Sequence, residues 1–206
     1  MGVLTSIDMS DIVLAHGCSL ALVLNNPLDG RRTVATALRL VLARITGMPP
    51  EKLRLDRTEQ GKPFLVADVP VLFNVSHARD HSLIALSHRG PVGCDIEGRF
   101  QSDDVHRLSP LVLHPEEQHA IASLDGKTLQ DAFKRCWVRK ESVLKARGTG
   151  FGADPQVVMV GFGDAPTVCA DPQGRQLYLH DGPLVAGNMT AVASEDAACS
   201  WYSLRG

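Results

Sequence analysis

Three carboxylates and one lysine in two short segments could form a metal-dependent phosphate site. Asp95 and Glu97 alternate in the run Gly-Cys-Asp-Ile-Glu that begins at Gly93, shortly after an apolar stretch. Residues i and i+2 of a strand point to one face, so the two carboxylates would lie side by side. At ~5 Å they would repel by roughly 3 kcal/mol at an effective dielectric of 20, and Mg²⁺, which prefers oxygen ligands, would remove that repulsion. The same spacing also fits two exposed acids on a hairpin, so the spacing alone leaves both interpretations open.

The second segment is an amphipathic helix predicted over residues 129–147. This stretch lacks Gly and Pro, carries apolar residues at helical spacing, and is followed by Gly148, a typical helix terminator. Glu141 and Lys145 are four residues apart and therefore share a face of the helix. They could be an exposed ion pair of little energetic consequence. Alternatively, Glu141 is a third metal ligand and Lys145 a cation for phosphate, and the spacing does not decide between these interpretations.

The elements that must position these groups follow from periodicity and turn residues. The apolar run 83–86, the loop at 89–91 and the run from Val92 predict a hairpin that carries Asp95 and Glu97. Residues 32–45 have apolar side chains at helical spacing and precede Gly47 and two prolines, which predicts a second long helix. The polar stretch 101–110 indicates a seam between two halves. Further strands are predicted at 19–24, 53–55, 72–75, 157–160, 166–170, 176–179, 189–193 and 199–204, and a short helix at 115–124.

Composition restricts the class of protein. The 206 residues are 44% hydrophobic and 21% charged, which is typical of a globular protein with a substantial core. A formal net charge of -2 argues against a nucleic-acid-binding surface, although basic residues cluster along the helix at 129–147. The longest apolar stretch, 12–24, is too short to span a membrane. Five cysteines without a Cys-x-x-Cys pair, and acids rather than bases at the N-terminus, favour a reduced, cytoplasmic protein.

Two further motifs complete an ordered set. Gln60-Gly61-Lys62-Pro63 precedes Phe73-Asn74-Val75-Ser76-His77, which precedes Gly93-x-Asp95-x-Glu97, and the helix contributes Trp137, Lys140, Glu141, Lys145, Gly148 and Gly150. In this order and spacing the chain resembles the 4′-phosphopantetheinyl transferase superfamily, specifically the larger surfactin-synthetase type. The resemblance covers roughly residues 29 to 152. A single Asp-x-Glu or Ser-His pair would indicate little, whereas the ordered set of four motifs is specific.

The resemblance implies an enzyme that transfers the 4′-phosphopantetheine arm of coenzyme A to a serine of an apo acyl or peptidyl carrier protein and releases 3′,5′-ADP. It implies Mg²⁺, or alternatively Mn²⁺, as cofactor. The expected metal ligands are Asp95, Glu97 and Glu141. The expected catalytic residues are Asp95, Glu141, Lys145 and His77, with Glu141 as the base and Glu117 as a less favoured base. The expected contacts to coenzyme A are Arg32, Gln60, Gly61, Lys62, Ser76, His77 and Lys145.

The resemblance also implies the architecture. We expect an α+β pseudo-dimer of two similar α+β halves, each a small, mostly antiparallel sheet packed with a long helix. The N-terminal half, residues 1–100, would carry the coenzyme A loop and the Asp-x-Glu hairpin. The C-terminal half, residues 101–206, would carry the Trp-x-x-Lys-Glu helix, with the active site between the halves. We expect a monomer that binds neither nucleic acid nor membrane.

Two other functions are compatible with the same residues. Only four residues separate Leu24 from Asp29 and none is basic, whereas larger members of the family usually carry additional cations in this region. The chain could therefore be a non-catalytic module that binds coenzyme A or a carrier protein. It could also be an unrelated Mg²⁺-dependent hydrolase of phosphate anhydrides. The carrier protein and the metabolic pathway it serves, whether fatty acid, polyketide or nonribosomal peptide synthesis, are not encoded in any recognisable motif.

Overall fold

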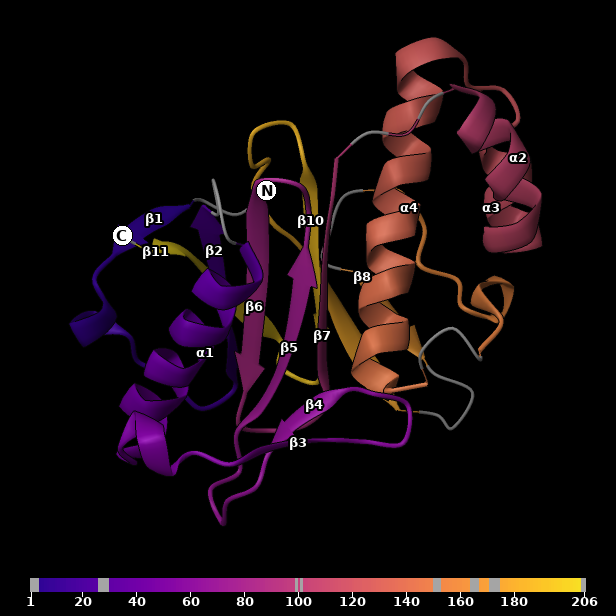
Figure 1. Cartoon of the computed structure of the whole chain (residues 1–206). Coiled ribbons are helices and arrows are strands. Elements are labelled where there is room, and N and C mark those ends of the chain that lie inside the picture. Colours follow the sequence, from indigo (N-terminus) through magenta and orange to yellow (C-terminus); the bar gives the residue numbers. More distant parts are fainter. Residues whose placement is uncertain are drawn as a thin grey trace.

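The computed structural model shows an α+β protein in which two larger sheets lie between helices (Figure 1). A third sheet in the described residues has two antiparallel strands, β3 (Leu55–Arg57) and β4 (Pro63–Leu65). The structure describes residues 4–25, 30–98, 100, 102–149, 153–163, 167–170 and 175–204. The helices are α1 (Gly30–Thr46), α2 (Ser102–Val112), α3 (Pro115–Ile121) and α4 (Gly126–Arg147), with 3-10 turns at Met9–Asp11, Pro50–Lys52 and Pro155–Val157. No helix in these ranges is long and apolar enough to cross a membrane.

Within the described residues, the first sheet has five strands in the order β1-β11-β2-β6-β5. The strand β2 pairs antiparallel with β6 and parallel with β11, and β5 forms the edge beside β6. This edge carries the Phe-Asn-Val-Ser-His motif. The bounds are β1 (Thr5–Ile7), β2 (Cys18–Asn25), β5 (Leu72–His77), β6 (His81–Ser87) and β11 (Ala198–Leu204).

The second sheet of the described chain has four antiparallel strands in the order β7-β10-β9-β8. Its strands are β7 (Val92–Glu97), β8 (Thr167–Ala170), β9 (Gln176–Asp181) and β10 (Met189–Ser194). The predicted hairpin is therefore wrong: β6 and β7 are consecutive, but β6 pairs with β2 and β5, whereas β7 pairs with β10. The sequence from 81 to 97 resembles a hairpin because two apolar runs flank a short turn. The two strands nevertheless belong to different sheets.

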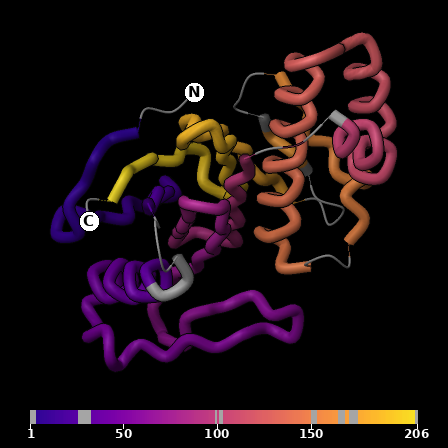
Figure 2. Tube along the Cα trace, turned by 45° about the horizontal axis from the view of Figure 1, so that its top comes forward, coloured from indigo at the N-terminus to yellow at the C-terminus, as the bar shows by residue number. Residues whose placement is uncertain are grey.

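Alternation along the strands explains how the layers form. On β2, Leu20, Leu22 and Leu24 pack under α1, while Ala21 and Val23 face the second sheet. On β7, Val92, Cys94 and Ile96 face the first sheet, so the alternate residues face α4. A third cluster joins α2, α3 and α4 to the second sheet. Figure 2 shows the backbones of these helices side by side from another direction.

Other segments also differ from the sequence-based prediction. The strand predicted at 53–55 lies at Leu55–Arg57 instead. The polar stretch at 101–110, predicted as a seam, contains most of α2. The buried face of this helix is formed by Val105 and Val112, which are about two helical turns apart. The strand predicted at 157–160 is absent from the described chain. There the backbone bonds to side chains instead: Val160 N–H donates to Glu117 at 2.7 Å and Val158 C=O accepts from Lys140. The apolar pattern fits a strand because Val158 and Val160 are buried.

Candidate active site

The site lies where the edges of the two sheets meet the helix α4. The edge strand β5 lies next to the edge strand β7, and α4 packs along β7 (Figure 1). Along β5, side chains alternate: Phe73 packs into the core beneath α1, whereas Asn74 and Ser76 face β7. The Asn74 side-chain carbonyl accepts from Cys94 N–H at 2.9 Å and so holds the backbone of β7 one residue before Asp95. The motif on β5 thus positions the motif on β7.

Ser76, Asp95 and Lys145 form one hydrogen-bonded cluster. The Ser76 hydroxyl donates to Asp95 Oδ1 at 2.8 Å, and Lys145 Nζ donates to the same oxygen at 2.6 Å and to Ser76 Oγ at 3.1 Å. The other oxygen, Asp95 Oδ2, is buried and has no hydrogen-bond partner. A buried carboxylate oxygen without a partner is costly, and such an exception marks a place where a ligand or ion fits.

The charges in this cluster act on each other. Burial alone would lower the pKa of the Lys145 ammonium, but the charge of Asp95 and its hydrogen bond outweigh burial and raise that pKa above its ordinary value. Burial raises the pKa of Glu141, and the negative charges of Asp95 and Glu97 raise it further, against the effect of Lys145. Glu141 is therefore close enough to sense both acids of β7, and its carboxylate is a stronger base than an exposed glutamate.

Gly93 explains how β7 comes so close to α4. A Cβ atom at this position would lie 2.0 Å from the backbone oxygen of Ser142 and 2.3 Å from the backbone nitrogen of Ala146. Only a residue without a side chain allows this approach, because both neighbours are backbone atoms of a packed helix. The glycine of the Gly-x-Asp-x-Glu motif thus has a packing role that its sequence context did not reveal.

The acids fit a magnesium ion in their chemistry. Carboxylate oxygens are the ligands Mg²⁺ prefers, and Asp95 Oδ2 lacks a partner while Glu141 has its pKa raised by the neighbouring acids. Across the part of the chain that is described, no three such side chains converge closely enough to form a complete metal cage. Glu97 Oε1 instead accepts from Gly98 N–H at 2.8 Å, and Lys145 neutralises part of the charge of Asp95.

Glu117 belongs to a different part of the protein. It is 3% exposed and pairs with Lys140 at 2.7 Å, and it accepts backbone N–H groups of His114, Val160 and Gly161. These groups come from the N-terminus of α3, from α4 and from the loop at 160–161. A base for a carrier serine must be reachable, so this closed arrangement favours Glu141 over the alternative, Glu117, as the base.

The remaining predicted residues lie at the edges of the site. His77 is exposed at the end of β5, with Nδ1 at 2.8 Å from Ser82 Oγ. Gln60 and Gly61 form the exposed turn between β3 (Leu55–Arg57) and β4 (Pro63–Leu65). The side chain of Arg32 lies outside the described residues, as does Gly150. Trp137 packs against Phe100, with ring centroids 5.3 Å apart, as expected for a core residue.

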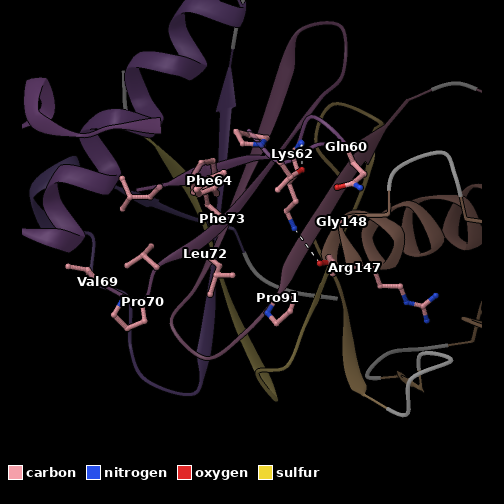
Figure 3. Close-up of a pocket in the computed structure, with 15 residues that line it drawn as sticks. Gln60, Lys62, Phe64, Val69, Pro70, Leu72, Phe73, Pro91, Arg147 and Gly148 are labelled. Atoms are coloured by element: carbon pink, nitrogen blue, oxygen red, sulfur yellow. Dashed lines mark hydrogen bonds between the residues drawn. The ribbon is translucent and has the colours of Figure 1, made fainter. Parts of the chain in front are cut away.

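A pocket of about 440 Å³ opens between the β3–β4 turn, the start of β5 and the end of α4 (Figure 3). Its wall is mostly apolar, with Phe64 and Leu72 partly exposed to it. Lys62 lies on its border, and its ammonium points towards the last turn of α4 rather than into open solvent. This orientation was not foreseen, because the Gly-Lys-Pro motif by itself does not indicate what the lysine contacts.

Comparison with known proteins places these motifs in a family. Residues 91–195 match the 4′-phosphopantetheinyl transferase superfamily, and residues 29–89 match the N-terminal region of 4′-phosphopantetheinyl transferase. The 4′-phosphopantetheinyl transferase AcpT of Salmonella typhi is 36% identical over 140 residues, which are 68% of this chain and 70% of that protein. The 4′-phosphopantetheinyl transferase HetI of a Nostoc species is 33% identical over 116 residues, which are 55% of this chain and 49% of that protein.

Coverage differs among the relatives. A Synechocystis relative is 34% identical over 128 residues, so the match spans only 52% of that protein. The chain thus spans about half the length of two of these relatives and more than two thirds of the third. The family match covers the strand with Asp95, the helix with Glu141 and Lys145, and the second sheet that supports them. With these motifs, this fold and these matches, the chain belongs to the 4′-phosphopantetheinyl transferase superfamily.

Proposed function

We propose that this protein transfers the 4′-phosphopantetheine arm of coenzyme A to a serine hydroxyl of an apo carrier protein and releases 3′,5′-ADP in a Mg²⁺-dependent reaction. The observation that carries the proposal is the cluster of Ser76, Asp95 and Lys145, with its unpartnered carboxylate oxygen and Glu141 nearby. A lysine beside an incompletely bonded carboxylate suits a pyrophosphate that is bound partly through a cation.

In this reaction the carrier serine oxygen bonds to the β-phosphorus of coenzyme A, and the bond from that phosphorus to the bridging oxygen breaks. Asp95, Glu97 and Glu141 would hold Mg²⁺, which supplies neutralisation of the pyrophosphate charge when bound. Lys145 stabilises the negative charge that develops on the departing 3′,5′-ADP. Glu141, or a water that it holds, takes the proton of the serine hydroxyl. Ser76 and His77 contact the phosphates from β5.

The test is a transfer assay with coenzyme A, Mg²⁺ and a panel of apo carrier proteins of the fatty-acid, polyketide and peptide-synthetase types. Mass spectrometry should detect one phosphopantetheine arm added to the carrier serine. Release of 3′,5′-ADP without an acceptor would instead indicate a hydrolase. Carrier or nucleotide binding that persists in Glu141→Gln, with no transfer by the wild type where a reference enzyme works, would indicate a binding module.

Metal dependence has its own test, which does not require turnover. Addition of Mg²⁺ should raise the melting temperature of the wild-type protein, because a ligand that binds only the folded state stabilises it by about 2.7 kcal/mol at 100 times its Kd. EDTA should reverse the shift and stop transfer. Glu141→Gln should abolish the shift, whereas Glu116→Gln, an exposed residue of α3, should keep it. An equal shift in both variants would exclude Glu141 as a ligand.

We further propose that residues 1–100 and 101–206 are structurally related halves of a pseudo-dimer, with one strand of each half exchanged: β7 pairs in the second sheet and β11 in the first. In support, α1 packs on the first sheet as α4 packs on the second, and β5 and β7 are edge strands that adjoin each other. Superposition of α1-β5-β6 on α4-β9-β10 tests the proposal. A different handedness or order of the superposed elements would contradict it.

A further inference from the structure

Lys62 makes contacts that a residue reserved for substrate would not make. Its backbone belongs to the turn between β3 and β4, where Gly61 has a φ of 82° and Gly61 N–H donates to Thr58 C=O at 2.8 Å. Lys62 N–H donates to Thr58 Oγ1 at 3.1 Å, and Thr58 N–H donates to Lys62 C=O at 2.9 Å. The turn is thus closed on itself and presents the lysine stem in one direction.

The ammonium group reaches the two elements that carry the acids and Lys145. Lys62 Nζ donates to Lys145 C=O at 2.6 Å, to Val92 C=O at 3.1 Å and to Ala146 C=O at 3.3 Å, the last of which is drawn in Figure 3. An ammonium has three N–H donors, and three carbonyls accept them. Within the described ranges, no carboxylate forms an ion pair with Lys62.

The electrostatics of the helix end favour this arrangement. The last carbonyls of a helix carry partial negative charge and lack intrahelical donors, so a cation placed there is stabilised. Burial lowers the pKa of Lys62 to about 8, so the group is still mostly protonated at neutral pH. An ammonium held in a partly buried position by three carbonyls is not free to follow a ligand.

We propose that Lys62 is a positioning residue whose ammonium fastens the β3–β4 turn to both the start of β7 and the end of α4. Val92 lies three residues before Asp95 on β7, and the Lys145 carbonyl belongs to the residue whose side chain contacts Asp95. The bonds of Lys62 therefore fix the distance between the two backbones that bring Asp95 and Lys145 together. The catalytic consequence depends on the proposed transferase function, whereas the structural one does not.

A kinetic experiment separates positioning from substrate binding. A lysine that only binds coenzyme A in the ground state raises the KM for coenzyme A when removed and leaves kcat unchanged. A positioning lysine lowers kcat, since small misplacements of catalytic groups reduce rates strongly. For Lys62→Met we expect kcat to fall about 10-fold and the KM for coenzyme A to change less than about 2-fold. Lys62→Arg, which keeps the cation and several donors, should recover part of kcat.

The control is Lys127→Met, because Lys127 is an exposed lysine at the other end of α4 that pairs with Asp131. It should leave kcat and KM unchanged. A rise in KM with unchanged kcat in Lys62→Met would overturn the proposal and assign Lys62 to the substrate. If Lys62→Met does not fold, Lys62→Arg decides alone: a lowered kcat at constant KM supports positioning, and a raised KM at constant kcat contradicts it.

Amide hydrogen exchange tests the same contact without turnover. Lys62→Met should increase exchange in the turn at 58–62 and at Gly148, whose N–H bonds to the same Lys145 carbonyl, while β9 stays unchanged. Lys127→Met should not increase exchange at Gly148. Unchanged exchange at both sites would overturn the proposal. Absence of transfer by the wild type, together with increased exchange in Lys62→Met, would count against the transferase alone.

Discussion

Two lysines of α4 form ion pairs with carboxylates of other elements, and the two pairs differ in how completely their polar atoms are hydrogen-bonded. Lys140 and Glu117, 2.7 Å apart, have side chains that are 1% and 3% exposed. Lys145 and Asp95, 2.6 Å apart, have side chains that are 28% and 7% exposed. In the first pair Lys140 also bonds to two backbone carbonyls and Glu117 accepts three backbone N–H groups. In the second pair Asp95 Oδ2 has no partner.

The difference shows that charge and motif membership do not identify a reactive group. Both lysines belong to the same helical motif, yet only the pair of Lys145 leaves an oxygen unbonded and reaches solvent. A saturated buried pair has no capacity for a ligand, and breaking it leaves an uncompensated charge. An unsaturated, partly exposed pair can exchange its contacts with a ligand at small cost. We therefore expect one pair to govern stability and the other to govern turnover.

The largest expected effect concerns the buried pair. Glu117→Ala leaves the Lys140 ammonium buried without its carboxylate and removes the acceptor of three backbone N–H groups, so the free energy of unfolding should fall by about 3–5 kcal/mol. Urea unfolding measures this. The neighbouring exposed residue provides the control, because Glu116→Ala should change stability by less than about 0.5 kcal/mol. A loss below about 1 kcal/mol for Glu117→Ala would show that this pair is not a structural centre.

The next effect concerns the active-site pair. Asp95→Ala should reduce phosphopantetheine transfer by about 100-fold, equivalent to roughly 2.7 kcal/mol, because it removes an anchor for the cation and for Lys145. Its unfolding free energy should change much less than that of Glu117→Ala, because Lys145 can turn to solvent. Asp103→Ala, at the exposed start of α2, should retain full transfer. Retention of transfer by Asp95→Ala would contradict the division between the two pairs.

A smaller effect is expected at the contact that brings β7 to α4. Gly93→Ala places a Cβ atom within 2.0 Å of a backbone oxygen, so the helix and the strand must separate. Overpacking of this kind costs about 1–3 kcal/mol of stability. Because the separation moves Asp95 from Lys145, transfer should fall although no reactive group is removed. Gly47, at the end of α1, has open space around its Cα but a positive φ, so Gly47→Ala should lose stability without separating β7 from α4.

The smallest effect is the pH dependence of the stability that the buried pair of Glu117 and Lys140 contributes. Burial would raise the pKa of Glu117, but its hydrogen bond and charge interaction with Lys140, together with two backbone N–H groups, lower it below the ordinary value. A carboxylate with a lowered folded-state pKa adds stability above its unfolded pKa of about 4.5, and this stability is lost as the pH falls through the folded value. The stability difference between wild type and Glu117→Gln should therefore decrease below pH 4.5 and stay constant above it. A difference that grows on acidification would reverse the assigned direction.

Local sequence was sufficient for most elements. The helices predicted at 32–45 and 129–147 are present at 30–46 and 126–147, and the strand predicted at 72–75 extends to His77. These elements follow from apolar periodicity and from turn residues such as Gly47 and Gly148. The prediction of a strand at 157–160 was wrong because buried valines also occur in irregular segments that pack against the core. Here the side chains of Glu117 and Lys140, rather than a neighbouring strand, bond to the backbone. The prediction of a hairpin was wrong because the consecutive strands β6 and β7 each pair with a strand distant in sequence, β2 and β10 respectively.

The sequence by itself determined the family and the order of the motifs, because each motif is a short run of residues near each other in the chain. Only the tertiary structure decided which charged groups have partners for all their polar atoms. It placed Glu117 in a closed network, left one oxygen of Asp95 unbonded, and directed the Lys62 ammonium to carbonyls 30 and more residues away. Such outcomes depend on contacts between segments distant in sequence, where burial and the supply of donors set the energy of each polar group.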